Sequence, residues 1–191
     1  MIRSSSLSRV IPQSGLGLSK MKSIMKSISA PELATVTDLN QIEQRAVTEA
    51  VNPLIADAFA LYVKTKNFHW HLYGPAFRDY HLLFDEHADA LLESVDVMAE
   101  RVRRVGGTTI RSISHIGKLQ TIEDDNDELV PANEMVERLM KDNAVMAKAL
   151  RNAIDVCDDH RDSATSNQLQ DILDKTERRK WFLFEILQGN R

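Results

Sequence analysis

A regular apolar stripe over residues 77–105 constrains the fold more than any other feature of the sequence. Apolar and aromatic residues recur there at spacings of three and four, and the stripe ends at Gly106-Gly107. This spacing follows the turn of a helix, whereas a half-buried strand would alternate at every second residue. The stripe predicts one long bundle helix, whose buried members are Phe77, His81, Phe84, Ala88, Leu91, Val95, Met98, Val102 and Val105.

A similar stripe precedes it. Asp38 and Gln41 form a candidate N-cap pair for a helix that runs towards Tyr73, and Gly74-Pro75 then turns the chain. Pro53 lies within this helix and is expected to kink it or divide it in two. The predicted buried members after the proline are Leu54, Ala58, Leu61, Thr65, Phe68 and Leu72.

Two more helices are predicted after a polar, acidic connection over residues 108–131, which has room for a short helix. The last helix is expected to begin at a cap formed by Asp162 or Ser163 and to end near Gln188. Two helical hairpins joined by one long crossover fit an all-α, ferritin-like four-helix bundle, with the crossover between the second and third helices. The predicted buried members are Val136, Leu139, Asn143, Met146, Leu150, Ala153 and Cys157, then Leu169, Leu173, Thr176, Leu183 and Leu187.

The net charge of -4 is the sum of two unlike parts. Residues 1–31 hold five basic residues and no acid, which leaves 19 basic and 28 acidic residues, a net of -9, for the remainder. We therefore predict a basic N-terminal tail over residues 1–37 and a bundle domain over residues 38–191. The single cysteine, Cys157, excludes an internal disulfide framework. No apolar run reaches the ~18 residues of a membrane span, so no membrane partner is expected.

The tail has three open interpretations. It can be a solvated terminus, an organelle transit peptide, or an arm that neutralises nucleic-acid phosphates. Met21 or Met25 is also a possible start, which would remove part of the tail. The composition does not rank these alternatives. The candidate DNA-binding residues are Arg3, Arg9, Lys20, Lys22 and Lys26.

Histidines and carboxylates gather around the turn between the first two helices. Four of the six histidines, His69, His71, His81 and His87, lie within nineteen residues, among several acids. Imidazole and carboxylate without thiolate suit iron, manganese or zinc better than copper(I). Taken singly, each residue also fits a packed core histidine or a solvated acid, so the prediction depends on spacing.

The spacing predicts a metal site shared by two subunits. His81 and Asp85 are four residues apart on one helix, as are Asp96 and Glu100, and the four occupy one side of it. Asp85 and Asp96, however, are separated by roughly 16 Å along the helix axis, so one metal cannot join them within one chain. Two copies of this helix packed antiparallel about a two-fold axis would bring each pair against the other copy's pair.

His69 completes the predicted site. It precedes Gly74 by about as many residues as His81 follows it, so a helical hairpin places the two histidines at similar height. The expected ligands are His69, His81 and Asp85 of one chain with Asp96 and Glu100 of its mate. His71 is ~200° away from His69 around the helix and is expected to point elsewhere, and His87 also leaves the predicted face.

These residues resemble a known family. Asn67-Phe68-His69-Trp70, Gly74, Phe77, His81, Phe84-Asp85, Asp96 and Ala99-Glu100-Arg101 are similar to the motif of the Dps family, the miniferritins or DNA-binding proteins from starved cells. The resemblance covers roughly residues 38–188, and its specific part is residues 67–107.

The resemblance implies a ferroxidase. It implies a hollow dodecameric shell that oxidises Fe2+, usually with hydrogen peroxide, stores the ferric mineral, and protects DNA from oxidative damage in the cytoplasm. The family's iron ligands carry over onto His69, His81, Asp85, Asp96 and Glu100. Trp70 stands where a radical-quenching tryptophan has been proposed, although packing at a dimer interface explains it equally well. The resemblance further implies that acids at the start of the last helix draw Fe2+ into a channel, the candidates being Asp158, Asp159, Asp162, Asp171 and Asp174.

The alternative function is that of a nucleoid-associated DNA-binding protein. In that interpretation the basic tail carries the function and metal chemistry is secondary. Twelve weak tails on one shell would engage a polymer together, so avidity favours DNA binding despite the acidic body.

Overall fold

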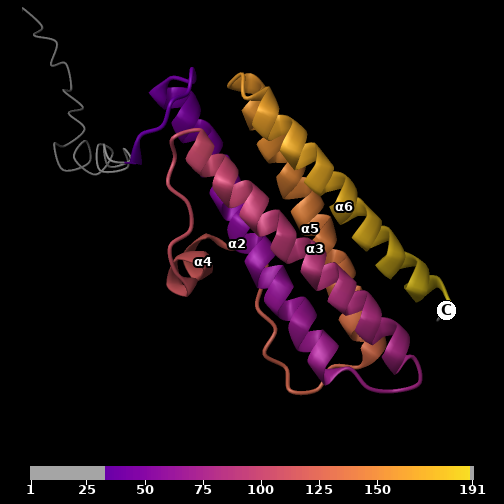
Figure 1. The fold of residues 1–191 in the computed structure, drawn as a ribbon. Coiled ribbons are helices and arrows are strands. Elements are labelled where there is room, and N and C mark those ends of the chain that lie inside the picture. The colour runs from indigo at the N-terminus through magenta and orange to yellow at the C-terminus, as the bar shows by residue number, and fades with distance from the viewer. Residues whose placement is uncertain (1–32, 190–191) are drawn as a thin grey trace, which may run out of the picture.

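The computed structural model describes residues 33–189, so the five basic residues of the predicted tail lie outside it. The described chain folds into five α-helices and contains no strand (Figure 1). The helices are α2 (Gln41–His71), α3 (Phe77–Arg104), α4 (Ile113–Leu119), α5 (Ala132–Asp159) and α6 (Ser163–Gln188).

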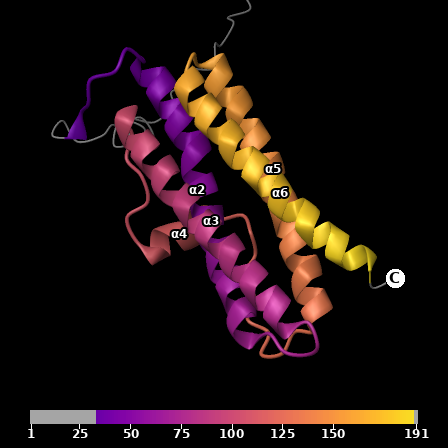
Figure 2. The same cartoon turned by 45° about the vertical axis from the view of Figure 1, so that its right-hand side comes forward.

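Four long helices form the predicted bundle. α2 packs mainly against α3 and α5 mainly against α6, while α2 also contacts α5 and α3 contacts α6. The short α4 contacts α2 from outside the bundle, within the crossover that joins the two hairpins (Figures 1 and 2). The all-α bundle with one long crossover is therefore confirmed.

The core follows the predicted stripes. All of the residues predicted to be buried on α5 are buried. The same is true of the predicted residues from Leu54 to Leu72, the last of which directly follows α2. On α3, Phe77 is 44% exposed and His81 is half-buried, because both lie where the α2–α3 hairpin opens; on α6, Leu173 and Leu187 are half-buried. By length and composition α2 resembles a membrane-crossing helix, yet its apolar residues form the bundle core.

The start of α2 differs from the prediction. The N-cap is Asn40, whose side chain accepts from the backbone N–H groups of Ile42 and Glu43, while the Glu43 carboxylate accepts from the Asn40 N–H. This capping box takes the place of the predicted Asp38–Gln41 pair. It satisfies the backbone N–H group of the cap residue Asn40 and, at the same time, those of Ile42 and Glu43 in the first turn. At the start of α6, Asp162 is the cap, as predicted.

Pro53 does not divide α2. The helix is continuous from Gln41 to His71, and the residues on both sides of the proline, Val51 and Leu54, are buried in the core. Packing on this apolar stripe outweighs the one hydrogen bond that proline removes.

Asp57 attaches the crossover to α2. Its buried carboxylate accepts hydrogen bonds from the Thr121 N–H (2.5 Å), the Thr121 hydroxyl (2.8 Å) and the Ile122 N–H (3.0 Å). Ile116 of α4 and Ile122 after it are also buried. The connection therefore holds α4 beside the middle of α2, which shapes the surface described below.

Candidate metal centre

A tight turn brings the end of α2 against the start of α3. Gly74 has φ +102°, a left-handed conformation that glycine adopts without steric cost, and its carbonyl accepts from the Phe77 N–H at 3.1 Å. The turn fixes how α3 is aligned along α2, and it thereby sets which residues of the two helices face each other.

His69 and His81 meet at this end of the hairpin. Their rings stack with centroids 3.7 Å apart and an interplanar angle of 20°. His69 Nδ1 lies 2.8 Å from the His81 carbonyl oxygen, and His81 Nδ1 lies 3.1 Å from the His69 carbonyl oxygen. A carbonyl oxygen only accepts, so each Nδ1 carries a proton, and Nε2 is the ring nitrogen left for a metal ion.

Asp85 adds a carboxylate to the pair. Its Oδ1 lies 3.9 Å from His69 Nε2 and accepts a 2.6 Å hydrogen bond from the Lys66 ammonium. The Lys66 hydrogen bond lowers the pKa of Asp85 against the opposing effect of desolvation. Asp85 is therefore charged, but in this arrangement Lys66 occupies the oxygen nearest His69. Lys66 was not among the predicted site residues, although it lies about one helical turn before His69.

Asp96 and Glu100 do not join these three residues within the chain. Both are exposed on α3, and Glu100 forms a 2.5 Å ion pair with Arg104. In the described part of the chain, no group of three or more histidine, cysteine or acidic side chains is placed to hold a metal ion. One chain thus brings His69 and His81 together, with Asp85 near His69, and it carries Asp96 and Glu100 on a separate part of α3.

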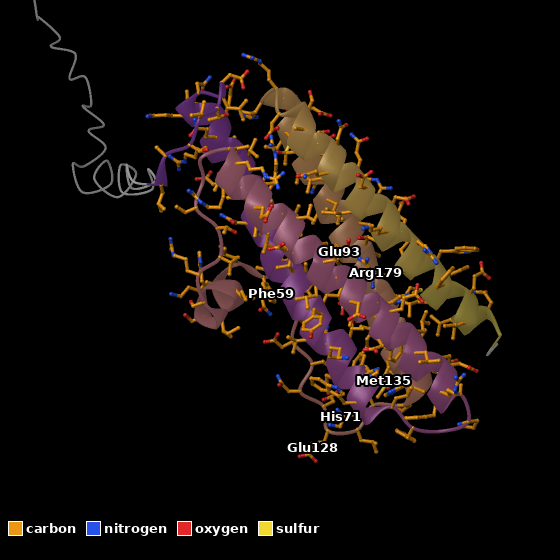
Figure 3. The ribbon with its side chains drawn as sticks, in the orientation of Figure 1. Phe59, His71, Glu93, Glu128, Met135 and Arg179 are labelled. Atoms are coloured by element: carbon orange, nitrogen blue, oxygen red, sulfur yellow. The ribbon has the colours of Figure 1, made fainter. Side chains whose placement is uncertain are left out.

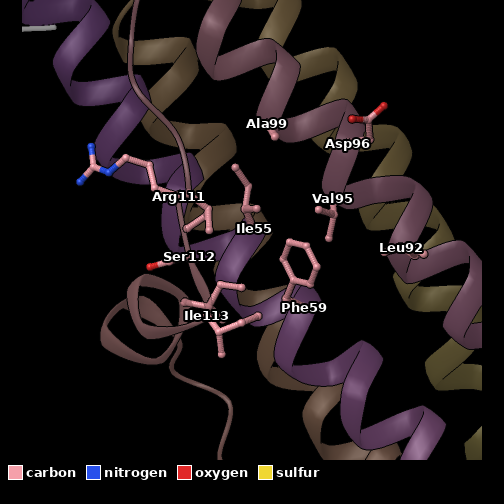
Figure 4. Close-up of a pocket in the computed structure, with 11 residues that line it drawn as sticks. Ile55, Phe59, Leu92, Val95, Asp96, Ala99, Arg111, Ser112 and Ile113 are labelled. Carbon is pink, nitrogen blue, oxygen red and sulfur yellow. The ribbon is translucent and has the colours of Figure 1, made fainter. Parts of the chain in front are cut away.

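Asp96 lies beside an open apolar cavity. The cavity has a volume of about 580 Å³ and lies between α2, α3 and the crossover (Figure 4). Its walls include Phe59 of α2, Leu92 of α3 and Ile113 of α4, and the side chains of Leu92 and Ile113 are exposed. An exposed apolar surface of this kind next to charged residues is typical of an interaction face.

The remaining candidate residues lie apart from the histidine pair. Trp70 is 64% exposed, with Lys66 Nζ 5.9 Å from its ring centroid. His71 is exposed, and its Nδ1 donates to the Asn67 carbonyl at 2.9 Å (Figure 3). His87 is buried on the side of α3 that faces α6, where burial, with nearby arginines, lowers its pKa to about 4.

Asp162, one of the candidate channel acids, is committed elsewhere. It is buried, caps α6, and accepts a 2.6 Å hydrogen bond from the Arg101 guanidinium. Its carboxylate therefore ties α3 to α6 and does not face a solvent channel.

Comparison with known proteins places the chain in a family. A model of the ferritin-like domain matches residues 48–191. An uncharacterized low temperature-induced protein of Nostoc sp. is 33% identical over 152 residues, covering 79% of this chain and 85% of that protein. A protein of Brevibacillus brevis named DNA protection during starvation protein is 32% identical over 145 residues, covering 76% and 97%.

Solved structures agree with these matches. The crystal structure of a Dps protein from Bacillus brevis superposes with a TM-score of 0.75 and 31% sequence identity, covering 78% of this chain and 99% of that one. The chain therefore belongs to the Dps family of the ferritin-like superfamily.

Proposed function

We propose that this protein is a ferroxidase that oxidises Fe2+ and stores ferric iron inside a shell of its own subunits, thereby protecting DNA. The observation that carries the proposal is a stacked pair of imidazoles, each anchored through its Nδ1, with the charged carboxylate of Asp85 3.9 Å from His69 Nε2. Imidazole and carboxylate together bind Fe2+ while leaving positions open for an oxidant. The starvation-protection names of its relatives support the same role.

We further propose that Asp96 and Glu100 of a two-fold mate complete the site. Asp96 lies roughly 16 Å from Asp85 along α3, and Glu100 lies farther still, so one metal site needs a second chain. The open apolar cavity beside Asp96 supports this arrangement, because a second copy packed on it would bury the exposed Leu92 and Ile113. An isologous contact would then form two equivalent sites in each dimer.

The proposed reaction uses Fe2+ as its substrate. Two Fe2+ ions each give up one electron, the O–O bond of hydrogen peroxide breaks, and two protons are taken up to form two water molecules. Paired electron transfer of this kind avoids the release of hydroxyl radical. The carboxylates favour Fe3+ as the harder ion. Lys66 and Fe2+ compete for Asp85, because Lys66 holds the carboxylate oxygen that lies nearest His69 Nε2.

Removing Asp96 and Glu100 together tests the proposal. The Asp96→Ala/Glu100→Ala variant is expected to reduce the rate of Fe2+ oxidation, followed aerobically and with peroxide, by at least ~100-fold. The matched control, Asp89→Ala/Glu93→Ala, removes two exposed acids of the same helix and is expected to retain the wild-type rate. Wild-type oxidation by the first variant would refute the assignment.

Co-assembly tests the shared site directly. We would mix the double variant with a His81→Ala/Asp85→Ala variant, since each alone lacks every complete site. In a mixed dimer, one of the two sites receives all of its ligands, so activity should return in part. If no activity returns although mixed oligomers form, the ligands do not come from two chains.

DNA binding by the tail is a second candidate function, and the five basic residues among 1–31 with no acid favour it. Deletion of residues 1–31 is expected to abolish a DNA mobility shift at low salt. Replacing the five basic residues by glutamine keeps the length of the tail, so this variant distinguishes the effect of losing the charge from the effect of losing the segment. A shift retained by both variants would exclude the arm, and N-terminal sequencing of the native protein tests the transit-peptide alternative.

A further inference from the structure

A second cavity, lined mainly by charged side chains, lies between α3 and α6. It has a volume of about 150 Å³ and is lined by three cationic side chains, Lys175, Arg178 and Arg179, together with His87, Glu86 and Glu93. Pockets for drug-sized ligands typically exceed ~300 Å³, so this cavity accommodates only a small ion or molecule. Figure 3 labels Glu93 and Arg179 in this region of the bundle.

Arg179 is the unusual member of this group. It is only 4% exposed, and it donates to the Asn143 side-chain oxygen at 3.0 Å and to the Thr176 hydroxyl at 2.8 Å. Both acceptors are neutral, and no ion pair of the described chain includes Arg179. Burial lowers the pKa of Arg179 to about 10, so the guanidinium is still charged at neutral pH.

This arrangement leaves a buried positive charge without a counter-ion. A guanidinium has five N–H donors, and the two contacts of Arg179 use only its Nε and Nη2 groups, which leaves Nη1 for the cavity that Arg179 lines. Burying an uncompensated charge is costly, and such groups are normally paired. The cavity that Arg179 lines is the place where an anion can supply the missing charge.

The neighbouring acids do not supply that charge. Glu93 lies 3.2 Å from Lys175 Nζ, and Glu86 lies 3.8 Å from Arg178 Nη2, so each faces an exposed cation of α6. The Arg178 guanidinium also lies over the Phe182 ring, 5.1 Å from its centroid. The exposed cations are thus positioned at the surface above Arg179.

We propose that this cavity binds one small tetrahedral oxyanion, of the class of inorganic phosphate, on the guanidinium of Arg179. The planar fork of arginine suits two oxygens of such an anion, and charge-assisted hydrogen bonds of this kind are stronger than neutral ones. Arg178 and Lys175 add positive charge at the entrance. The site binds an anion, so it is independent of the Fe2+ site proposed above.

The test is calorimetric titration of inorganic phosphate into iron-free, full-length protein at constant ionic strength. One phosphate per subunit is expected. Arg179→Gln is expected to weaken binding by at least ~10-fold, because a charge-assisted hydrogen bond contributes that much. Arg151→Gln is the matched control: it removes an exposed arginine that pairs with Glu177 elsewhere on the α5–α6 hairpin, and it should bind as the wild type does.

A second variant covers the case in which Arg179→Gln fails to fold. Lys175→Gln/Arg178→Gln changes only exposed residues and is expected to weaken phosphate binding severalfold while leaving the helical circular dichroism spectrum unchanged. Phosphate should also raise the Tm of the wild type more than it raises that of this variant.

Three results would overturn the proposal. They are the absence of saturable phosphate binding, equal affinity in the wild type and both cavity variants, and binding of a single-stranded oligonucleotide at this site in place of free phosphate. The Asp96→Ala/Glu100→Ala variant separates the two proposals. It should bind phosphate normally, whether or not it oxidises Fe2+.

Discussion

The two sides of α3 present opposite kinds of polar site. Towards the α2 hairpin, His69 and His81 have their Nδ1 groups bonded to backbone carbonyls, which leaves lone pairs and the Asp85 carboxylate for a cation. Towards α6, Arg179 has a buried guanidinium whose hydrogen-bond partners within residues 33–189 are neutral oxygens. The metal side thus offers lone pairs and negative charge, and the α6 side offers positive charge. The two proposals therefore assign a metal ion to one side of α3 and an anion to the other.

The largest expected effect comes from removing a ligand on the metal side of α3 while leaving the α6 side unchanged. His81→Ala should reduce Fe2+ oxidation to the rate of buffer without protein, since it removes an imidazole and the ring stacked on His69. Phosphate binding by the same variant should stay at the wild-type value. Parallel oxidation and calorimetric assays check both, and loss of both activities would show that the two sides are not independent.

The second effect concerns stability at low pH. His87 is buried and neutral, and its folded-state pKa is lowered to about 4 from 6.5. Burial of neutral His87 contributes fully to the free energy of unfolding above pH 6.5. This contribution is lost as the pH falls towards 4, because His87 takes up a proton in the unfolded chain at a higher pH than in the folded one. The loss amounts to about 3 kcal/mol.

His87→Phe should therefore reduce the slope of unfolding free energy against pH in this range. The measurement is denaturant unfolding of iron-free protein at fixed protein concentration between pH 4 and 7. The control, His71→Phe, changes an exposed histidine and should keep the wild-type slope. Identical slopes in all three proteins would contradict the burial argument.

A smaller effect is expected at the turn that aligns the metal side. Gly74→Ala places a side chain at φ +102° and should destabilise the protein by about 1 kcal/mol. Gly117→Ala is a close control: Gly117 lies within α4 with open space around it, so this change should be neutral or slightly stabilising. Thermal unfolding measures both, and equal Tm changes would argue against strain at Gly74.

The smallest effect concerns Lys66. Lys66→Met removes the cation that competes for Asp85, so the affinity for Zn2+, a redox-inert probe, should rise. The increase should be at most about fivefold, because a partly exposed ion pair contributes no more than about 1 kcal/mol. Lys175→Met removes a lysine on the α6 side and should leave Zn2+ affinity unchanged. Weaker Zn2+ binding by Lys66→Met would mean that Lys66 positions Asp85.

The sequence predicts the bundle well because the spacing of apolar residues along a helix indicates which side of the helix is buried. The stripes from Leu54 to Leu72 and from Val136 to Cys157 are buried as predicted, and the hairpin argument anticipates that His69 and His81 lie level. Details at helix ends were less predictable, because Asp38 and Asn40 both precede a suitable partner by three residues. The continuity of α2 through Pro53 depends on packing by α3 and α5, which is not visible locally.

Charged residues inside the bundle were the hardest to foresee. Arg179 lies in a run of basic residues that suggests a solvated face, yet it is three residues after Thr176 and four before Leu183, both predicted to be buried. That spacing was the signal for its burial. Whether Asp96 and Glu100 complete the metal site depends on a second chain, so neither the sequence nor one subunit decides it.

Each of the two histidines bonds through its Nδ1 to the backbone carbonyl of the other, and this determines which part of the chain is needed to build the site. All of one subunit's converging groups lie within residues 66–85, a single helix-turn-helix segment, and their orientation depends on carbonyls of that same segment. Their arrangement does not depend directly on the crossover or on the second hairpin. Insertions elsewhere in the chain should therefore leave it intact, and grafting this segment onto another antiparallel helix pair should transfer half of a metal site.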